Sequence, residues 1–167
     1  MNIMVFLHGT AIMHAAAAGQ PRAERVRQSR RGGPSVRDFA SYLPAEAAVR
    51  KVAAWQCGGA QICYLSSHRA AQDVALDQDV LARHGFPAGQ VYYRQPGESY
   101  ADVVRRARAG LLIEDDCESI GGVAQTTRAS LAAGPGPAVR CIVVPEFGGL
   151  AHLPDDPAQL WRPTLES

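Results

Sequence analysis

Hydrophobic and polar positions alternate in blocks along the chain. Five short runs rich in β-branched and other apolar residues predict buried strands at residues 3–7, 61–65, 91–93, 111–114 and 139–144. Stretches of helical periodicity between them predict helices at residues 45–56, 70–84 and 100–109. Strands that alternate with helices imply right-handed crossovers and a mostly parallel sheet. We therefore predict an α/β fold, a doubly wound, Rossmann-like parallel sheet of about five strands flanked by helices.

Two segments do not follow this alternation. Residues 10–43 carry six arginines and the sequence Gly32-Gly33-Pro34, which makes them a poor candidate for a continuous helix. We expect an irregular flap or miniature cap over the carboxyl edge of the sheet. Residues 121–137 form a connection of small residues that ends in Gly-Pro-Gly-Pro. The whole chain, residues 1–167, is predicted to be one domain with residues 10–43 as an insertion.

Composition narrows the class of protein only slightly. A chain of 167 residues with 47% hydrophobic and 20% charged residues is typical of one globular domain. The net charge of +1 gives no reason to expect a nucleic acid or a membrane surface as partner. No segment approaches the roughly 18 apolar residues of a membrane span, and residues 1–7 lack the basic start of a signal peptide. A cytoplasmic location is expected.

The cysteines do not suggest chemistry of their own. Cys57, Cys63, Cys117 and Cys141 form no C-x-x-C pair. Two of them, Cys63 and Cys141, lie within predicted buried strands, where a thiol behaves as a small hydrophobic group. We interpret them as structural rather than as disulfide or metal-binding residues.

Polar residues follow three of the predicted strands. The first strand leads into Phe6-Leu7-His8-Gly9-Thr10, the second into Ser66-Ser67-His68-Arg69 and the fourth into Glu114-Asp115-Asp116. In an open parallel sheet, functional groups gather at the carboxyl ends of the strands. These residues are therefore expected to meet at one edge.

The order of these motifs resembles the haloacid dehalogenase-like superfamily from residue 3 to about residue 144. In that family the first strand ends in Asp-x-Asp-Gly-Thr, the second in a phosphate-binding Ser or Thr, and the fourth in an acidic pair that binds magnesium. Gly9-Thr10, Ser66 and residues 114–116 match these motifs. The resemblance implies a Rossmann-like fold with an active site at the strand ends.

The two aspartates on which that family's chemistry depends are missing. The nucleophile's position is occupied by Phe6, and the acid/base position by His8. A phenyl ring can neither attack phosphorus nor give Mg²⁺ a carboxylate oxygen. The family's lysine falls near Ser99 or Tyr100, and three arginines stand close enough in sequence to replace it, namely Arg94, Arg105 and Arg106. We interpret the chain as a degenerate member for which ordinary phosphatase activity is not expected.

The candidate site residues have specific expected roles. His8 is the predicted acid/base, with Asp115 or Asp116 as its partner or as a metal ligand. The predicted substrate-binding residues are Thr10, Ser66, Ser67, His68, Arg69 and Glu146. The cofactor is expected to be either none or a divalent metal ion, and a set of His8, His68 and an aspartate would suit a transition metal.

Structural interpretations compete with these roles. Ser66 and Ser67 also suit a simple helix cap, and Asp116 could cap the next helix while Glu114 faces solvent. The arginines of residues 22–37 could close over an anionic substrate, although such a run is more often a solvated surface.

Several functions stay open at this level. The leading hypothesis is an enzyme acting on a small anionic metabolite by chemistry other than phosphate hydrolysis. A non-catalytic ligand- or protein-binding domain and an Mg²⁺-dependent phosphohydrolase with an unrecognised nucleophile are the alternatives, and a homodimer is compatible with each. An α/β-hydrolase is a further rival, because residues 117–121 nearly match its Gly-x-Ser-x-Gly elbow around Ser119.

Overall fold

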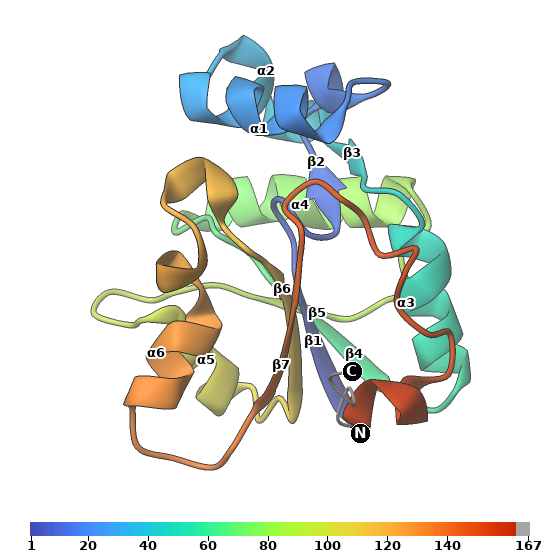
Figure 1. Ribbon diagram of the computed structural model, residues 1–167, viewed down its shortest axis with the longest axis vertical. Coiled ribbons are helices and arrows are strands. Elements are labelled where there is room, and N and C mark those ends of the chain that lie inside the picture. The colour runs from blue at the N-terminus through green and yellow to red at the C-terminus, as the bar shows by residue number, and fades with distance from the viewer. Residues whose placement is uncertain (163–167) are drawn as a thin grey trace.

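The computed structural model describes residues 1–162, which fold around a five-stranded sheet with β1 in the middle (Figure 1). The strand order is β5-β4-β1-β6-β7, and every neighbouring pair is parallel. The strands are β1 (Asn2–Phe6), β4 (Gln61–Leu65), β5 (Gln90–Tyr92), β6 (Leu111–Asp115) and β7 (Arg140–Val144). Each overlaps a strand predicted from the sequence, so the predicted parallel α/β fold is confirmed.

The position of each strand explains its composition. In β1, Ile3 pairs with Ile62 on one side and Leu111 on the other, and all three side chains are buried. Strands covered on both faces read as continuous apolar runs. The edge strand β7 is half-buried along most of its length, so Cys141 is only half-buried there, whereas Cys63 in β4 is buried as predicted.

Helices cover both faces of the sheet (Figure 1). One face packs against α3 (Ala48–Cys57) and α4 (Ala71–Arg83), and the other against α5 (Tyr100–Arg106) and α6 (Thr127–Ala133). Alternate residues of each strand enter the two cores, as the period of two requires. The longest of these helices, α4, has 13 residues, and no helix within residues 1–162 is both long and apolar enough to cross a membrane.

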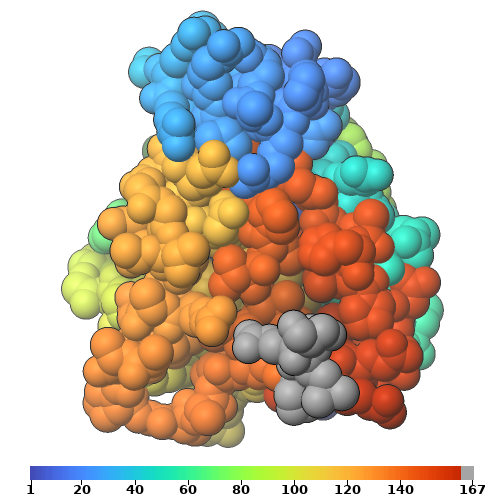
Figure 2. Space-filling model, in the orientation of Figure 1, coloured from blue at the N-terminus to red at the C-terminus, as the bar shows by residue number. Residues whose placement is uncertain are grey.

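The chain between β1 and α3 forms a layer over the carboxyl edge of the sheet, drawn in blue in Figures 1 and 2. We call residues 10–43 the cap segment. Its elements, with the last residue of β3 just beyond it, are β2 (Ile12–Met13), η1 (Ala15–Ala17), α1 (Arg22–Arg31), α2 (Pro34–Arg37), η2 (Phe39–Ser41) and β3 (Leu43–Pro44). The short strands β2 and β3 pair in antiparallel fashion.

The segment is not one continuous helix, as expected, but it is less irregular than predicted, because α1 is regular over ten residues. Gly32 ends the helix in a left-handed conformation, with φ of 63°, so the Gly-Gly-Pro sequence follows the helix instead of interrupting it. Only Val26 of α1 is buried, against Phe147 and two other apolar residues. A helix with one buried side chain leaves almost no periodic pattern in the sequence.

The connection after β6 is also more ordered than the sequence indicates. It contains η3 (Glu118–Ile120) and η4 (Val123–Gln125) before α6. Glu114 does not face solvent, because its buried carboxylate accepts hydrogen bonds from the backbone N–H groups of Thr127 and Arg128 at 2.8 and 2.7 Å. A carboxylate at the first turn of a helix satisfies free N–H groups and complements the helix dipole. Glu114 therefore holds α6 against the end of β6.

The chain after β7 returns along α3 to a short 3-10 helix, η5 (Pro157–Trp161). The Lys51 ammonium group bonds Asp155 at 2.6 Å, and the Trp55 indole N–H donates to the Pro154 carbonyl at 2.9 Å. These contacts fasten the return segment, so that the loop after β7 is held at the same edge as the ends of β1, β4 and β6.

Candidate functional site

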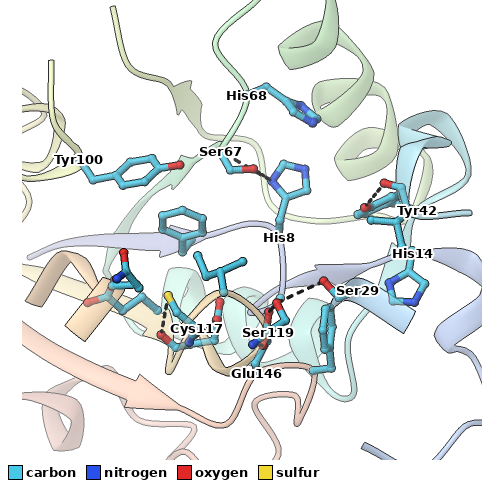
Figure 3. A pocket seen from close by; sticks show the side chains of 18 of the residues that line it. His8, His14, Ser29, Tyr42, Ser67, His68, Tyr100, Cys117, Ser119 and Glu146 are labelled. Atoms are coloured by element: carbon cyan, nitrogen blue, oxygen red, sulfur yellow. Dashed lines mark hydrogen bonds between the residues drawn. The ribbon is translucent and has the colours of Figure 1, made fainter. Parts of the chain in front are cut away.

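A cavity of about 380 Å³ lies between the carboxyl edge of the sheet and the cap segment (Figure 3). This volume falls within the range of small-molecule sites. The sheet side contributes Phe6, His8, Ser67 and Tyr100, and the cap segment contributes Phe39 and Tyr42, among other residues. The cavity is therefore lined both by residues at the strand ends and by residues of the cap segment.

His8 is the best oriented polar group of the cavity wall. Its Nε2 lies 3.0 Å from Oδ1 of Asp77, and its Nδ1 lies 2.8 Å from the Ser67 hydroxyl. The backbone N–H of Ser67 also points at Nδ1, at 3.4 Å. Because an N–H group can only donate, Nδ1 is the accepting nitrogen and Nε2 carries the proton. The His8 ring is thus held in one tautomer between a serine and an aspartate.

Asp77 is a fully buried carboxylate at the centre of three hydrogen bonds. Besides His8 it bonds Nδ1 of His68 at 3.1 Å, and it accepts from the Ser66 hydroxyl at 2.6 Å. Burial acts to raise the pKa of Asp77, but the bonds from His68, His8 and Ser66 outweigh it and hold the pKa well below its usual range. Asp77 is therefore ionised at neutral pH.

The second histidine responds in the opposite direction. Burial acts to lower the pKa of His68, yet the hydrogen bond and charge of Asp77 outweigh it, and the pKa is raised. The two imidazole rings lie 4.5 Å apart between centroids, and Phe39 covers His68 at 4.2 Å. Tyr42 packs edge-on against His8, at 5.6 Å. Aromatic residues of the cap segment therefore shield this polar group from water.

The predicted partner of His8 is corrected by this arrangement. Asp115 and Asp116 do not contact His8, and the predicted metal-binding set of two histidines with one of them does not form. The carboxylate that contacts both histidines belongs instead to Asp77, which sequence analysis missed. The signal was an aspartate three residues after Val74 and three before Val80, on the buried face of α4.

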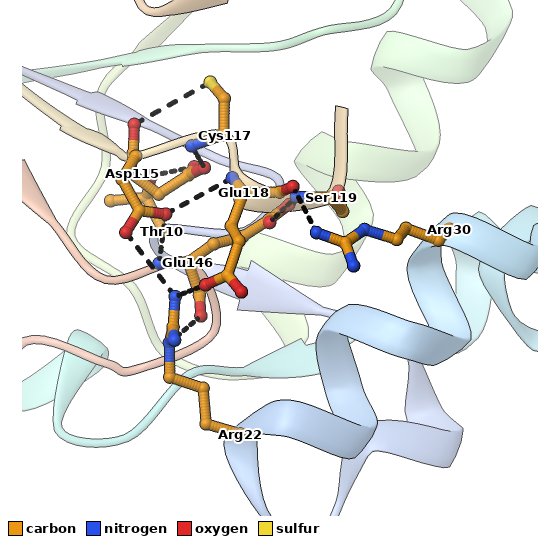
Figure 4. Close-up of polar contacts among 9 residues, drawn as sticks. Thr10, Arg22, Arg30, Asp115, Cys117, Glu118, Ser119 and Glu146 are labelled. Carbon is orange, nitrogen blue, oxygen red and sulfur yellow. Dashed lines mark hydrogen bonds and ion pairs between the residues drawn. The ribbon is translucent and has the colours of Figure 1, made fainter. Parts of the chain in front are cut away.

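A second polar group lies at the ends of β6 and β7 (Figure 4). Asp115 accepts from the Thr10 hydroxyl at 2.8 Å and from the Cys117 backbone N–H at 2.9 Å. Glu146 accepts from both the backbone N–H and the hydroxyl of Ser119, at 2.6 and 2.7 Å. Asp115 and Glu146 line the cavity, whereas Asp116 turns away from it toward Arg22.

Burial keeps these carboxylates easy to protonate. It raises the pKa of Asp115, against the hydrogen bonds of Thr10 and Cys117, and it raises the pKa of Glu146, with the nearby aspartate charges adding to the effect. The same environment, burial first and acidic neighbours second, raises the pKa of the Cys117 thiol to about 12. Cys117 is therefore a thiol at neutral pH and a poor nucleophile.

The arginines of the cap segment hold it to the body of the protein. Arg22 donates to the Glu146 carbonyl at 2.9 Å and pairs with Glu118 at 2.5 Å. Arg25 donates to the Phe147 carbonyl at 2.8 Å, and Arg30 to the Glu118 carbonyl at 2.9 Å. These three arginines thus neither close over an anion nor lie free in solvent, the two interpretations that the sequence left open.

Several predicted substrate-binding residues lie outside the cavity wall. Thr10 and Ser66 are fully buried, with their hydroxyls donated to Asp115 and Asp77. Arg69 is exposed at the start of the segment that leads into α4. Ser67, His68 and Glu146 do line the cavity, as does the predicted acid/base His8. The predicted residues thus meet at one edge but divide into two groups.

Two sets of side chains bring metal-ligating atoms together within residues 1–162. His8, His68 and Asp77 form one, and Asp115, Asp116 and Glu146 the other, each with all ligand atoms within 4.8 Å of one another. The family's magnesium site would take a further carboxylate from the position of Phe6, which has none. The carboxylates of the acidic set also already accept protein donors. This set does not reproduce that magnesium site.

The α/β-hydrolase alternative fails on the surroundings of Ser119. Ser119 lies in η3, not at a sharp turn between a strand and a helix. Its hydroxyl bonds Glu146 and lies 3.2 Å from that of Ser29, and no histidine among residues 1–162 is hydrogen-bonded to it. The elbow of that family requires a histidine as the base for this serine.

Arg94 lies close to the position at which the haloacid dehalogenase-like family has its lysine. Arg94 stacks on the ring of Tyr100, with its guanidinium carbon 3.9 Å from the ring centroid. The Nε of Arg94 is buried and has no hydrogen-bond partner within the described part of the chain. Arg105 and Arg106 instead lie on α5, where Arg106 pairs with Glu98 at 2.8 Å.

Comparisons with known proteins give only structural likenesses, since no family model and no curated protein matches the chain. A chain of the Pnkp1/Rnl/Hen1 complex superposes with a TM-score of 0.51 and 10% identity, over 87% of this chain and 46% of that one. The chain thus spans about half the length of that match. The D,D-heptose 1,7-bisphosphate phosphatase of B. bronchiseptica, complexed with magnesium and phosphate, superposes with a TM-score of 0.43 and 14% identity, over 88% and 93% of the two chains. At these identities the likeness extends to the fold alone. The chain has the predicted parallel α/β fold, and membership of the haloacid dehalogenase-like superfamily stays a prediction.

Proposed function

We propose that the protein is an enzyme that uses His8 as a general acid or base on a small anionic metabolite bound in the cavity. The observation that carries this proposal is the His8 ring, fixed between Ser67 and the buried, ionised Asp77 at the cavity wall. A buried carboxylate that orients an imidazole also stabilises the imidazolium formed when the ring takes a proton. Asp77 takes the role first expected of Asp115 or Asp116.

The anionic end of the substrate is assigned to the Tyr100 side of the cavity. No lysine or arginine lines the cavity itself within residues 1–162. Arg94 lies against Tyr100 with an unsatisfied buried Nε, and Arg69 and Arg94 both act to lower the pKa of Tyr100, although burial raises it overall. Neither arginine has an ion pair among the described residues. A carboxylate or phosphate at this rim would pair with both.

Aromatic side chains would hold the rest of the molecule. Phe6 meets Tyr100 edge-on at 5.1 Å, in the place where a phosphatase of the resembling family has its nucleophile. Phe39 and Phe147 line the cavity from the cap segment and from the loop after β7. The walls therefore favour a metabolite with an apolar body.

The test combines binding and turnover. Thermal shifts with a panel of carboxylated and phosphorylated metabolites identify binders, and their conversion is then followed with wild type, His8→Gln and His152→Gln. We expect His8→Gln to lose about 100-fold or more of kcat and to keep its thermal shift. His152 is exposed and outside the cavity, so His152→Gln should match wild type. Binders that wild type never converts, or full turnover by His8→Gln, would count against an enzyme of this kind.

A further inference from the structure

Ser67 is placed as an activated hydroxyl within the cavity. Its Oγ lies 2.8 Å from Nδ1 of His8, and Nδ1 is the nitrogen without a proton. The Ser67 hydroxyl is therefore the donor of this hydrogen bond, and Nδ1 of His8 is the acceptor. Nucleophilic serines are recognised by this relation to a base that a third group orients.

Several other hydroxyl groups around the cavity are committed elsewhere. Thr10, Ser66 and Ser119 donate to carboxylates, and the Tyr42 hydroxyl donates to the Val36 carbonyl at 2.7 Å. The Cys117 thiol is held in its protonated form, with a pKa of about 12, mainly by burial. Among these groups, Ser67 alone combines a position on the cavity wall with an imidazole acceptor.

The third member of the arrangement is Asp77. It is fully buried, its pKa is held low by its histidine and serine donors despite burial, and it lies 3.0 Å from the protonated nitrogen of His8. Serine, histidine and aspartate in this relation recur on unrelated folds. Here the serine meets Nδ1 and the aspartate Nε2, the reverse of the usual assignment. Because a proton at either nitrogen leaves the other as the base, the relay is chemically equivalent.

We propose that Ser67 is the nucleophile of an acyl-transfer reaction on a small ester or thioester; this inference rests on the proposed role of His8. The Ser67 oxygen bonds to the carbonyl carbon while its proton passes to Nδ1 of His8. The bond from that carbon to the alcohol or thiol breaks, and the leaving group takes the proton from His8. Water then attacks the acyl-serine, gives a proton to His8, and releases the acid as Ser67 regains its proton.

The walls near Ser67 favour an acyl over a phosphoryl group. A transferring phosphoryl group spreads negative charge over three oxygens, and such transfer is usually assisted by cations close to them. The cavity lining within residues 1–162 includes no lysine or arginine, and Glu114, Asp115 and Glu146 belong to it. An acyl group develops only one negative oxygen in the transition state. Arg69 and Arg94 lie outside this lining but near Tyr100, where they suit a charged tail.

A fluorophosphonate probe tests the nucleophile without knowledge of the substrate. Attack by an activated serine forms an oxygen–phosphorus bond and releases fluoride, and intact-protein mass spectrometry with peptide mapping locates the adduct. We expect one adduct on Ser67, its loss in Ser67→Ala, and labelling slowed about 100-fold in His8→Gln. Ser130, exposed on α6, offers the control Ser130→Ala, which should label like wild type. Unlabelled wild type, or an adduct on another serine, would overturn the proposal.

Turnover separates this inference from the proposed function. Ser67→Ala and His8→Gln are compared on a converted metabolite, and on p-nitrophenyl acetate with a pre-steady-state burst as the readout. Loss of turnover and of the burst in both variants supports the nucleophile, provided that their melting temperatures match wild type. Turnover that survives in Ser67→Ala but not in His8→Gln would remove the nucleophile and leave His8 as an acid or base.

Discussion

At the scale of single residues, burial and hydrogen bonding assign opposite states to the site's acidic groups. Asp77 receives donors from two histidines and a serine, so its charge is stabilised. Asp115 and Glu146 receive neutral donors only, and burial raises the pKa of both. One edge of the sheet therefore carries an ionised carboxylate beside histidines and carboxyl groups that bind protons more readily.

Replacing Asp77 tests the first of these states. Asp77→Asn leaves two histidines with a weaker acceptor, and we expect a loss of about 2 to 4 kcal/mol in the free energy of unfolding at pH 5 to 6. Because the pKa of Asp77 is lowered on folding, its contribution is present above the unfolded value of about 3.9 and is lost as the pH falls. Because the pKa of His68 is raised, the part due to protonated His68 is full below about 6.5 and is lost as the pH rises.

The difference between wild type and Asp77→Asn should therefore be largest between about pH 4 and 6.5. Urea denaturation at pH values from 3 to 8 measures it. Asp79, exposed on the same helix, provides the control Asp79→Asn, which should show no such maximum. A difference that grows steadily from pH 4 to pH 8 would contradict the assigned states.

Glu146 is expected to behave in the opposite way. A carboxyl group whose pKa is raised on folding binds its proton more tightly when native, so its contribution to stability is present at low pH and is lost as the pH rises above about 4.3. Glu146→Gln removes the cost of a buried negative charge at neutral pH and keeps an acceptor for the Ser119 N–H. We expect the melting temperature to rise by a few degrees at pH 7 and not at pH 4.

A carboxylate whose pKa is shifted in the opposite direction serves as the control for this experiment. The bond from Arg106, with help from the Gln95 backbone, lowers the pKa of Glu98, a half-buried carboxylate at the surface. Glu98→Gln should therefore not stabilise the protein at pH 7. Equal melting-temperature changes in the two variants would show that Glu146 is not under the strain that its burial implies.

At the scale of elements, the loop after β7 is fixed by one glycine against the start of α3. Gly149 has φ of 73°, and a Cβ there would lie 2.5 Å from the backbone oxygen of Glu46. The Leu150 N–H donates to that same carbonyl at 2.8 Å, so the oxygen cannot move without loss of a bond. The close approach brings the loop with Glu146 and Phe147 to the cavity.

Alanine at Gly149 should therefore cost more than backbone strain alone. Gly97 has a similar φ of 83° but open space around it, and Gly97→Ala is expected to cost about 1 kcal/mol. Gly149→Ala adds a clash with fixed backbone, and we expect about 2 to 4 kcal/mol. Chemical denaturation of the two variants gives the comparison, and equal losses would mean that the loop relaxes freely.

At the scale of the whole molecule, the cavity exists because the cap segment is held over the sheet by polar contacts. α1 buries only Val26, so little hydrophobic area holds it there. Arg22 and Arg25 bond carbonyls of the loop after β7, and Arg22 also pairs with Glu118. Opening of the cap should therefore need less free energy than unfolding of the sheet.

Loss of these two arginines should loosen the cap alone. In Arg22→Ala/Arg25→Ala we expect faster hydrogen–deuterium exchange in peptides from residues 15–43, with β1, β4 and β6 unchanged. Arg31 is exposed and has no hydrogen bond or ion pair among residues 1–162, so Arg31→Ala should exchange like wild type. Acceleration spread evenly over the sheet would mean that cap and sheet unfold as one unit.

The sequence alone determined the positions of the strands and the edge at which polar groups collect. Buried parallel strands read as local apolar runs, and residues just after them lie at the carboxyl edge whatever the packing. His8, Ser67, His68 and Glu146 were therefore predictable as neighbours of one cavity. Helix α1 was not, because its contacts are polar and leave no periodic pattern.

Only the tertiary structure decided which of these groups interact. His8 and Asp77 are 69 residues apart, and their contact depends on the rotation of α4 against the sheet and on the side chain at one turn of that helix. Asp115 is the last residue of β6, the strand next to β1, yet it bonds Thr10 and not His8. Contacts of this kind follow from side-chain direction and packing of whole elements, which local hydrophobic patterns do not encode.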